Sequence, residues 1–213
     1  MKKKEENFYR GTSKECLIAM GYYPNFIKMI NPENKPYEKL HQWLLENEKG
    51  FDDNNWSLPS LKELSKILSI DNGKIARYIN MLYNDIFLLN TQEPEKFKKD
   101  GQILCDLSFK YVYDNYSYFT LGLDYVPRIG EIFDFYFINP IMGCSSYYVK
   151  DVSHYYYSNG HTIRIKLLYG HPNQYLQLLR EKAYLKRYIS FHDYYSEHGY
   201  LLEEKLIKMF ENL

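Results

Sequence analysis

Cysteine is scarce in this chain of 213 residues, and the three that occur, Cys16, Cys105 and Cys144, form no C-x-x-C pair. This number and spacing argue against a disulfide framework and a cysteine-based zinc site, and they favour a reducing cytoplasm. Long apolar runs are missing as well, because the longest uncharged stretch, 135–149, contains asparagine, proline and glycine. We therefore expect no membrane span and a cytoplasmic protein. The basic first residues are not followed by an apolar segment, which predicts no secretory signal.

An excess of charge of either sign is also absent, since 27 lysines and arginines balance 27 aspartates and glutamates. This balance argues against a protein that binds polyanions by bulk charge alone, and any nucleic-acid surface must be a local patch. Aromatic residues, in contrast, make up 18% of the chain, with 24 tyrosines and 12 phenylalanines. These residues could stack on bases or on partner surfaces. They could equally reflect a proteome whose composition is biased toward tyrosine, lysine and asparagine, and composition alone does not decide between the two interpretations.

The common catalytic motifs are absent: the chain has no Gly-x-x-x-x-Gly-Lys phosphate loop, nucleophile elbow or His-Glu-x-x-His metal motif. His192 and His198 are six residues apart and would lie on different faces of a helix. His154 and His161 flank a turn and could face each other across a hairpin, without an adjacent carboxylate or cysteine. Cys144 is a lone thiol in a predicted turn. We therefore predict no catalytic residue, no metal site, no cofactor and no enzymatic activity.

The residue pattern predicts an α+β fold in three parts. Residues 1–35, which glycine and proline interrupt, are expected to be an irregular lead-in. Residues 36–109 are expected to form a helical domain that ends in a β hairpin. Residues 110–213 are expected to form a small antiparallel β-sheet or barrel domain with C-terminal helices.

Three helices are predicted in the second part, the first over residues 36–49. Ser60 should cap the next helix, with Glu63 completing a capping box, and Asp71 should cap a third helix that follows after a very short turn. Apolar residues then recur at helical spacing, and so tight a turn predicts that the two helices cross steeply.

Strand-like composition begins after Asp85. Residues 86–91 and 102–109 are predicted to pair as a hairpin around a charged loop. Further strands are expected over 118–123, 131–138, 147–154 and 162–168, with Asn159-Gly160 as a tight turn between the last two. The C-terminal part should be helical over 174–187 and 200–210.

The segment from Leu61 to Asn80 resembles a helix-turn-helix of the bacterial regulator type, and with the hairpin it resembles a winged helix. The positions that this family requires to be apolar are occupied by Leu64, Leu68, Ile70, Ile75 and Tyr78. Ser65 provides the small residue of the pattern, whereas Ser69 stands at the turn where glycine is usual. The resemblance covers about 20 residues for the motif and about 50 residues with the hairpin, and it implies that residues 36–109 are a winged helix-turn-helix domain.

The resemblance implies that the second helix of the motif enters the major groove of double-stranded DNA. Burial of the apolar positions would leave a base-reading face made of Asn72, Gly73, Ala76, Arg77 and Asn80. The predicted phosphate contacts are Ser60, Lys62 and Lys74 on the helices, and Lys96, Lys98 and Lys99 on the hairpin loop.

The expected function is sequence-specific DNA binding, by a transcriptional regulator or by a DNA-handling protein of a phage or mobile element. The β domain would form a homodimer or bind another protein. One alternative is a non-enzymatic interaction protein that uses the helix-turn-helix as a docking surface. Another is a metal-dependent enzyme that uses the histidines near the C-terminus. A basic C-terminal helix with Arg180, Lys182, Lys186 and Arg187 is either a solvated face or a second phosphate-binding surface.

Overall fold

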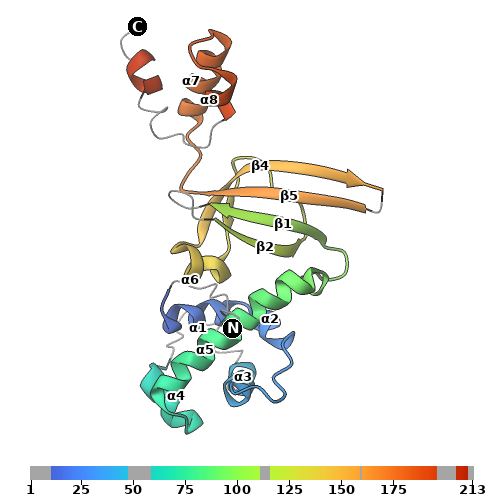
Figure 1. Cartoon of the computed structure of the whole chain (residues 1–213), viewed down its shortest axis with the longest axis vertical. Coiled ribbons are helices and arrows are strands. Elements are labelled where there is room, and N and C mark those ends of the chain that lie inside the picture. The colour runs from blue at the N-terminus through green and yellow to red at the C-terminus, as the bar shows by residue number, and fades with distance from the viewer. Residues whose placement is uncertain (1–10, 48–58, 111–115, 159, 196–204, 211–213) are drawn as a thin grey trace, which may run out of the picture. The chain divides into compact units, whose positions relative to one another are not determined.

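The computed structural model describes residues 11–47, 59–110, 116–158, 160–195 and 205–210 (Figure 1). The chain divides into two compact units, residues 1–170 and residues 171–213. The first unit combines helices with a curled five-stranded sheet, so that the protein is a mixed α and β fold. Within the described ranges, no helix is both long enough and apolar enough to cross a membrane.

The first unit begins with helices where the sequence predicts an irregular lead-in, so this prediction is wrong for the described residues 11–35. The helices are α1 (Ser13–Tyr22) and α2 (Pro24–Lys28). Thr12 caps the start of α1 in a capping box with Glu15. Gly21 lies in the last turn of this helix. Pro24 stands at the first position of α2, where its missing N–H costs no hydrogen bond. Glycine and proline therefore mark helix ends here, and not a loop.

Three further helices follow, and they occupy the segments in which the sequence predicts helices. They are α3 (Glu38–Glu46), α4 (Leu61–Leu68) and α5 (Asn72–Gln92). The long helix α5 has 21 residues, and in Figure 1 it runs from α4 toward β1 and β2.

The predicted strand over residues 86–91 is wrong, because these residues are the last turns of α5. Ile86, Phe87 and Asn90 are buried while Leu88 is 44% exposed, which is the pattern of a helix packed on one side. The predicted hairpin around the charged loop is consequently absent from the described residues 86–110. In its place, the short 3-10 helix η2 (Pro94–Phe97) inserts Phe97 against Phe119, with ring centroids 5.3 Å apart.

The sheet has the strand order β2-β1-β5-β4-β3. Its strands are β1 (Ile103–Lys110), β2 (Tyr116–Leu123), β3 (Ile132–Asp134), β4 (Ser146–Tyr157) and β5 (Gly160–Tyr169). Strands β1 and β5 are parallel and the other pairs are antiparallel, so the prediction of a wholly antiparallel sheet is wrong at the centre.

Most of the strands lie where the sequence predicts them. The predictions over 118–123, 147–154 and 162–168 are confirmed, and β4 and β5 pair as the expected hairpin, although Asn159 lies outside the described residues. The prediction over 131–138 is confirmed only for β3. After β3 the chain forms η3 (Tyr136–Ile138) and α6 (Asn139–Met142), and η3 buries Phe137 and Ile138 in the core.

Helices and sheet of the first unit share one hydrophobic core, whose centre is a cluster of phenylalanine rings. Phe87 of α5 stacks on Phe137 at 5.3 Å, and Phe119 of β2 lies 5.3 Å from Phe87. The amide of Asn90 extends this contact, since it donates to the carbonyl of Thr120 and accepts from its N–H, at 2.7 Å and 2.9 Å. The compact unit therefore extends across the boundary expected after residue 109, which falls within the paired strands β1 and β2.

The second unit contains α7 (Gln174–Leu185), α8 (Phe191–Tyr195) and a helical segment over residues 205–210. Leu179, Ala183, Ile189 and Leu206 form its small core. The helix predicted over 174–187 is confirmed by α7, and the predicted helix over 200–210 is described only from residue 205.

Candidate nucleic-acid interface

Helices α4 and α5 begin with the caps that the sequence predicts. Ser60 Oγ accepts a hydrogen bond from the Glu63 N–H at 3.2 Å, and Glu63 Oε2 accepts one from the Ser60 N–H at 2.7 Å. These bonds from Ser60 lower the pKa of the Glu63 carboxyl below its ordinary value. Asp71 Oδ1 accepts from the N–H groups of Gly73 and Lys74, at 3.0 Å and 3.3 Å. Each helix therefore starts at a fixed residue, and the Asp71 cap fixes where the short connection between α4 and α5 ends.

The connection turns sharply at Ser69, whose φ of 54° is in the left-handed region. This is the residue at which the helix-turn-helix pattern usually has glycine. The turn closes with a hydrogen bond from the Ile70 N–H to the Ser65 carbonyl at 3.0 Å, and the Ser65 hydroxyl donates to the Ile70 carbonyl. A serine thus adopts the backbone conformation that the pattern requires at this position.

The apolar positions of the motif face the core. Leu64 and Ile75 are completely buried, and Leu68, Ile70 and Tyr78 are partly buried against the same core. Burial on this side determines which side chains of α5 are accessible. Helix α3 adds Leu40 and Leu44 to the buried side.

The predicted base-reading residues lie on the N-terminal half of α5, and they differ in exposure. Asn72, Gly73 and Arg77 are exposed, whereas Ala76 and Asn80 are half-buried. The accessible part of the predicted face is therefore its first two turns. This part offers the guanidinium of Arg77 and the side-chain amide of Asn72, and at Gly73 it has no side chain.

The predicted phosphate contacts divide into two groups that the structure does not bring together. Ser60, Lys62 and Lys74 are exposed near the start of α4 or α5. Lys96, Lys98 and Lys99 follow the far end of α5, whose 21 residues are about 30 Å long.

The second group is held at that far end by local contacts. Lys96 forms an ion pair with Glu93 at 2.9 Å, and the backbone of Lys98 packs closely on Gly122. The prediction that these lysines lie on a hairpin beside the reading helix is wrong, because the hairpin would need a strand where α5 continues.

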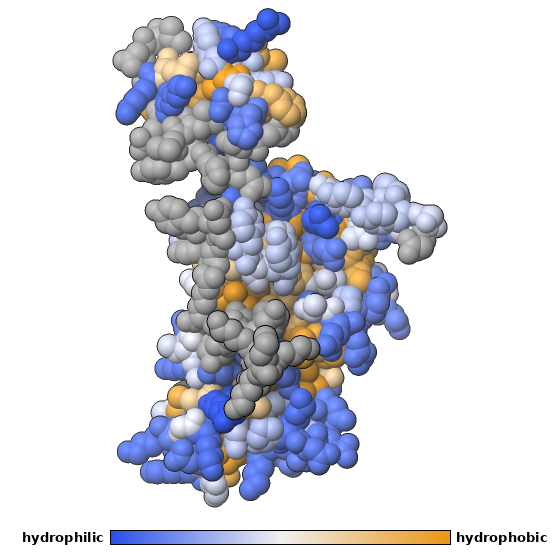
Figure 2. All heavy atoms as spheres, viewed as in Figure 1, coloured by the Kyte–Doolittle hydropathy of each residue, from blue (hydrophilic) through white to orange (hydrophobic). Residues whose placement is uncertain are grey.

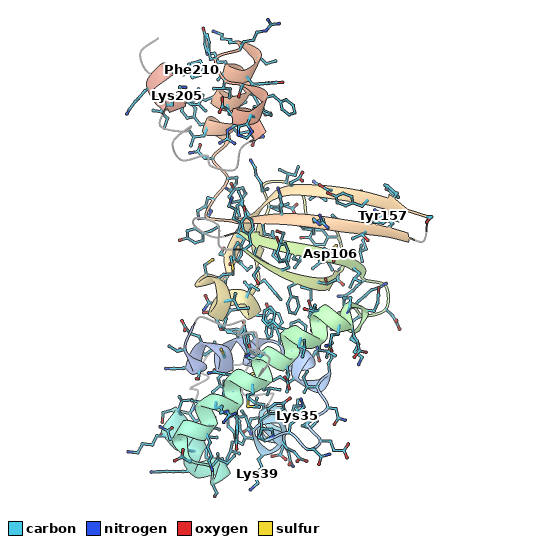
Figure 3. The ribbon with its side chains drawn as sticks, in the orientation of Figure 1. Lys35, Lys39, Asp106, Tyr157, Lys205 and Phe210 are labelled. Atoms are coloured by element: carbon cyan, nitrogen blue, oxygen red, sulfur yellow. The ribbon has the colours of Figure 1, made fainter. Side chains whose placement is uncertain are left out.

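Sequence reasoning missed two lysines, Lys35 and Lys39, which precede and begin α3 and which Figure 3 labels. With residues of the α4–α5 connection they line a groove of about 370 Å³. The groove is lined by Lys35, Pro36, Glu38, Lys39, Ser69, Ile70, Asp71, Lys74 and Tyr78. The signal in the sequence was two lysines four residues apart at the start of a predicted helix.

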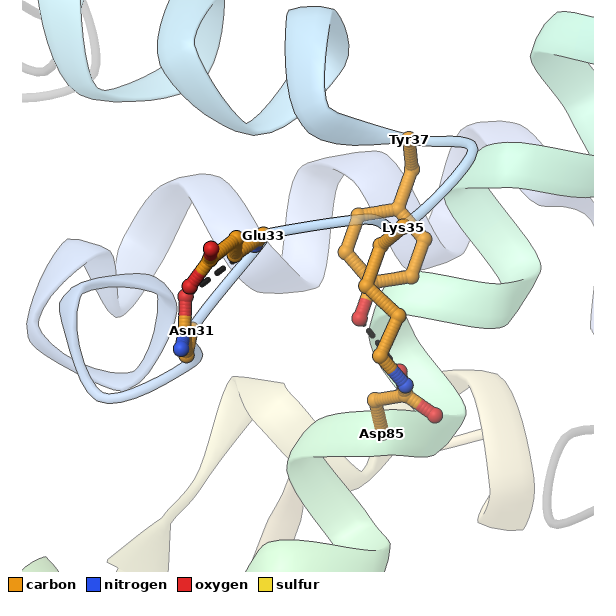
Figure 4. A network of polar contacts seen from close by, with 5 residues as sticks. All are labelled: Asn31, Glu33, Lys35, Tyr37 and Asp85. Carbon is orange, nitrogen blue, oxygen red and sulfur yellow. Dashed lines mark hydrogen bonds and ion pairs between the residues drawn. The ribbon is translucent and has the colours of Figure 1, made fainter.

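A polar network holds the segment before α3 on α5 (Figure 4). The hydroxyl of Tyr37 donates to Asp85 Oδ2, and Lys35 Nζ lies 3.1 Å from the same oxygen. Burial and the neighbouring Asp85 raise the pKa of Tyr37, which therefore stays a hydrogen-bond donor. Asn31 Oδ1 accepts from the Glu33 N–H at 3.0 Å and orders the turn that leads into the network. The segment that leads into Lys39 is therefore held on α5 by the contacts of Lys35 and Tyr37 with Asp85.

The charge around the motif is modestly positive. The basic residues of the groove and of α4 and α5 beside it are Lys35, Lys39, Lys62, Lys66, Lys74 and Arg77. The acidic residues are Glu38, Glu63, Asp71 and Asp85, and all but Glu38 accept the hydrogen bonds or the ion pair described above. Figure 2 shows hydrophilic side chains gathered over the end of the unit that carries α3 and α4.

The cysteines and histidines of the described ranges do not assemble into a recognisable reactive site. Burial raises the pKa of Cys16 to about 12 and that of Cys105 to about 11, and it also raises the pKa of Cys144. Each thiol is therefore held in its unreactive protonated form. His154 Nδ1 and His161 Nε2 do face each other at 3.0 Å, as the sequence suggests. No group of three or more possible metal ligands occurs among the described residues.

Comparison with protein-family models, with curated proteins and with solved structures finds no match to this chain.

Proposed function

We propose that the first unit binds double-stranded DNA by placing the N-terminal half of α5 in the major groove. The observation that carries this proposal is the exposure of Asn72, Gly73 and Arg77 directly after a left-handed turn, while the opposite side of α5 is buried. A capped helix that presents its first turns to solvent is the element that helix-turn-helix proteins insert into DNA.

The exposed side chains provide the chemistry for reading bases. The guanidinium of Arg77 can donate two hydrogen bonds to the O6 and N7 atoms of guanine, and the amide of Asn72 can bind adenine in the same bidentate way. Gly73 allows the helix to approach the base edges closely. Half-buried Ala76 and Asn80 contribute less to recognition than the sequence alone predicts.

Phosphate contacts would position the helix. Ser60, Lys62 and Lys74 are exposed beside the reading face and can bind the two sugar-phosphate strands that border the groove. Because the local charge excess is small, recognition of bases must provide a large share of the specificity. A regulator of transcription and a DNA-handling protein of a mobile element both need such a reader, with the sheet or the second unit available for self-association.

A second candidate function is docking on a protein through the same helix pair. Ile67 on α4 favours it, since this apolar side chain within the motif is 56% exposed and cannot bind phosphate. In that case any affinity for DNA would fall steeply with salt and would show no sequence preference.

The test is the substitution Arg77→Ala, measured by equilibrium binding to duplexes that the unaltered protein retains. We expect a loss of about 1–3 kcal/mol in binding free energy and a relaxed preference at one base pair. Arg128→Ala is the matched control, because Arg128 is also exposed but follows the sheet strand β2. Unchanged affinity and preference in Arg77→Ala would show that this face does not read DNA.

A further inference from the structure

We propose that the groove between residues 35–39 and the α4–α5 connection is a binding site for one phosphate group, supplied by the DNA backbone beside the major groove. The inference rests on the proposed function and adds to it two residues, Lys35 and Lys39, that lie outside the helix-turn-helix motif.

The groove has the size and lining of a phosphate site. Its volume of about 370 Å³ is more than ten times the share of liquid volume of one water, about 30 Å³. It therefore has room for a phosphate and part of its hydration shell. Lys39 and Lys74 come from two different helices and line the same groove, to which Ser69 and Tyr78 add hydroxyl groups. Lysine binds phosphate as a compact point charge, and hydroxyls donate to its oxygens.

The charges in the groove favour an anion. Lys39 and Lys74 form no ion pair within the part of the chain that the structure describes. The carboxylate of Asp71 accepts hydrogen bonds from the first turn of α5, which offsets part of its negative charge. Lys35 is paired with Asp85, so its main role is to hold its own segment in place. Glu38 is the other carboxylate that lines the groove, so that the positive charges of Lys39 and Lys74 exceed the negative charge that is left.

The position of the groove connects it to the reading face. Lys74 precedes Arg77 by three residues on α5, and side chains at this spacing are neighbours on a helix surface. A phosphate bound by Lys74 and Lys39 therefore lies next to the base pair that Arg77 would read. The turn at Ser69 and the network around Asp85 fix the two walls before DNA arrives, which reduces the ordering that binding requires.

The experiment compares Lys39→Gln and Lys74→Gln with Lys14→Gln, an exposed lysine of α1. Duplex affinity is measured by fluorescence anisotropy over a series of salt concentrations. Each groove variant should weaken binding to all sequences alike and should reduce the slope of log affinity against log salt by about 0.9. The Lys14→Gln variant should retain the original slope.

The outcomes separate this inference from the proposed function. If Lys39→Gln and Lys74→Gln have the same slope of log affinity against log salt as the unaltered protein, the groove does not bind a DNA phosphate. The proposal that α5 binds DNA would be unaffected by this result. If no duplex is bound at all, inorganic phosphate is titrated into the protein and followed by backbone amide resonances. Shifts around residues 35–39 and 69–78 that Lys39→Gln and Lys74→Gln abolish would then support a phosphate site and overturn DNA as its source. The absence of such shifts would overturn both.

Discussion

Ser69 is a residue whose backbone conformation is unfavourable for its own type. A left-handed residue with a side chain costs about 1–2 kcal/mol relative to the right-handed form, and glycine adopts this conformation without that cost. Glycine loses more conformational entropy on folding, which offsets part of this gain. We therefore expect Ser69→Gly to stabilise the protein by a net of about 0.5–1 kcal/mol. Urea denaturation measures the change, and Ser69→Val, which adds a branched side chain, should have the opposite effect. Destabilisation by Ser69→Gly would mean that the turn is not left-handed.

Glu63 should give the stability of α4 a dependence on pH. Its pKa is lowered in the folded state by hydrogen bonds from Ser60, so its contribution is present above the unfolded pKa and is lost as pH falls through the folded pKa. Glu63→Gln should therefore destabilise the protein near about pH 6, and the loss of stability should be smaller near about pH 3, because Glu63 itself becomes protonated as pH falls toward its folded pKa. Denaturant unfolding at the two pH values checks this. An equal loss at both values would show that charge does not contribute to the cap.

The exposure of Asn72, Gly73 and Arg77, the residues proposed to read DNA, was predictable from sequence because it depends on local signals. The caps at Ser60 and Asp71 and the apolar positions between them fix which side of α5 is exposed. Lys35 and Lys39 were not predictable as part of the site, since they meet Lys74 only through the packing of α3 against α5. No spacing within the chain encodes that contact.

At the scale of elements, the close approach of η2 to β2 explains how the segment after α5 is held. A Cβ added at Gly122 would lie 2.7 Å from the Cα of Lys98, which is backbone and cannot rotate away. We expect Gly122→Ala to destabilise the protein by about 1–3 kcal/mol, because one of the two segments must shift. Gly160→Ala is the control, since nothing lies within 4 Å of a Cβ there. Equal stability of the two variants in thermal unfolding would contradict the packing of Lys98 on β2.

The elements that sequence reasoning predicted correctly have strong local markers, and those it missed do not. Residues 86–89 are an apolar run that fits a strand as well as a buried helix turn, and only packing against β2 decides for the helix. Gly21 and Pro24 indicate a loop in isolation, although each also suits the end or the start of a helix. The parallel pairing of β1 with β5 joins residues far apart in the chain, such as Cys105 and Ile163, and alternation within a strand does not specify its partner.

At the scale of the whole molecule, the phenylalanine cluster makes the helices and the sheet of the first unit interdependent. Phe137 lies within 5.5 Å of the ring centroids of Phe26, Phe87 and Phe119, which come from α2, α5 and β2. We expect Phe137→Ala to destabilise the unit by about 3–5 kcal/mol, and tryptophan fluorescence and circular dichroism should report one common transition. Tyr156→Ala, at a site 77% exposed, is the control. Separate transitions would mean that helices and sheet fold independently.

The burial of these rings also bears on the aromatic composition. Many phenylalanines are accounted for by the core, whereas Tyr118, Tyr156 and Tyr157 are exposed on the sheet. Zero net charge for the whole chain is compatible with the proposed function, because Lys39 and Lys74 line one groove beside the exposed Arg77.

The most direct test of DNA reading is selection from a randomised duplex library at about 150 mM salt, followed by sequencing of the retained fraction. We predict an enriched motif that contains a guanine, and loss of preference at that guanine when the selection is repeated with Arg77→Ala. No enrichment by the folded protein, or the same motif with Arg77→Ala, would contradict the placement of α5 in the major groove.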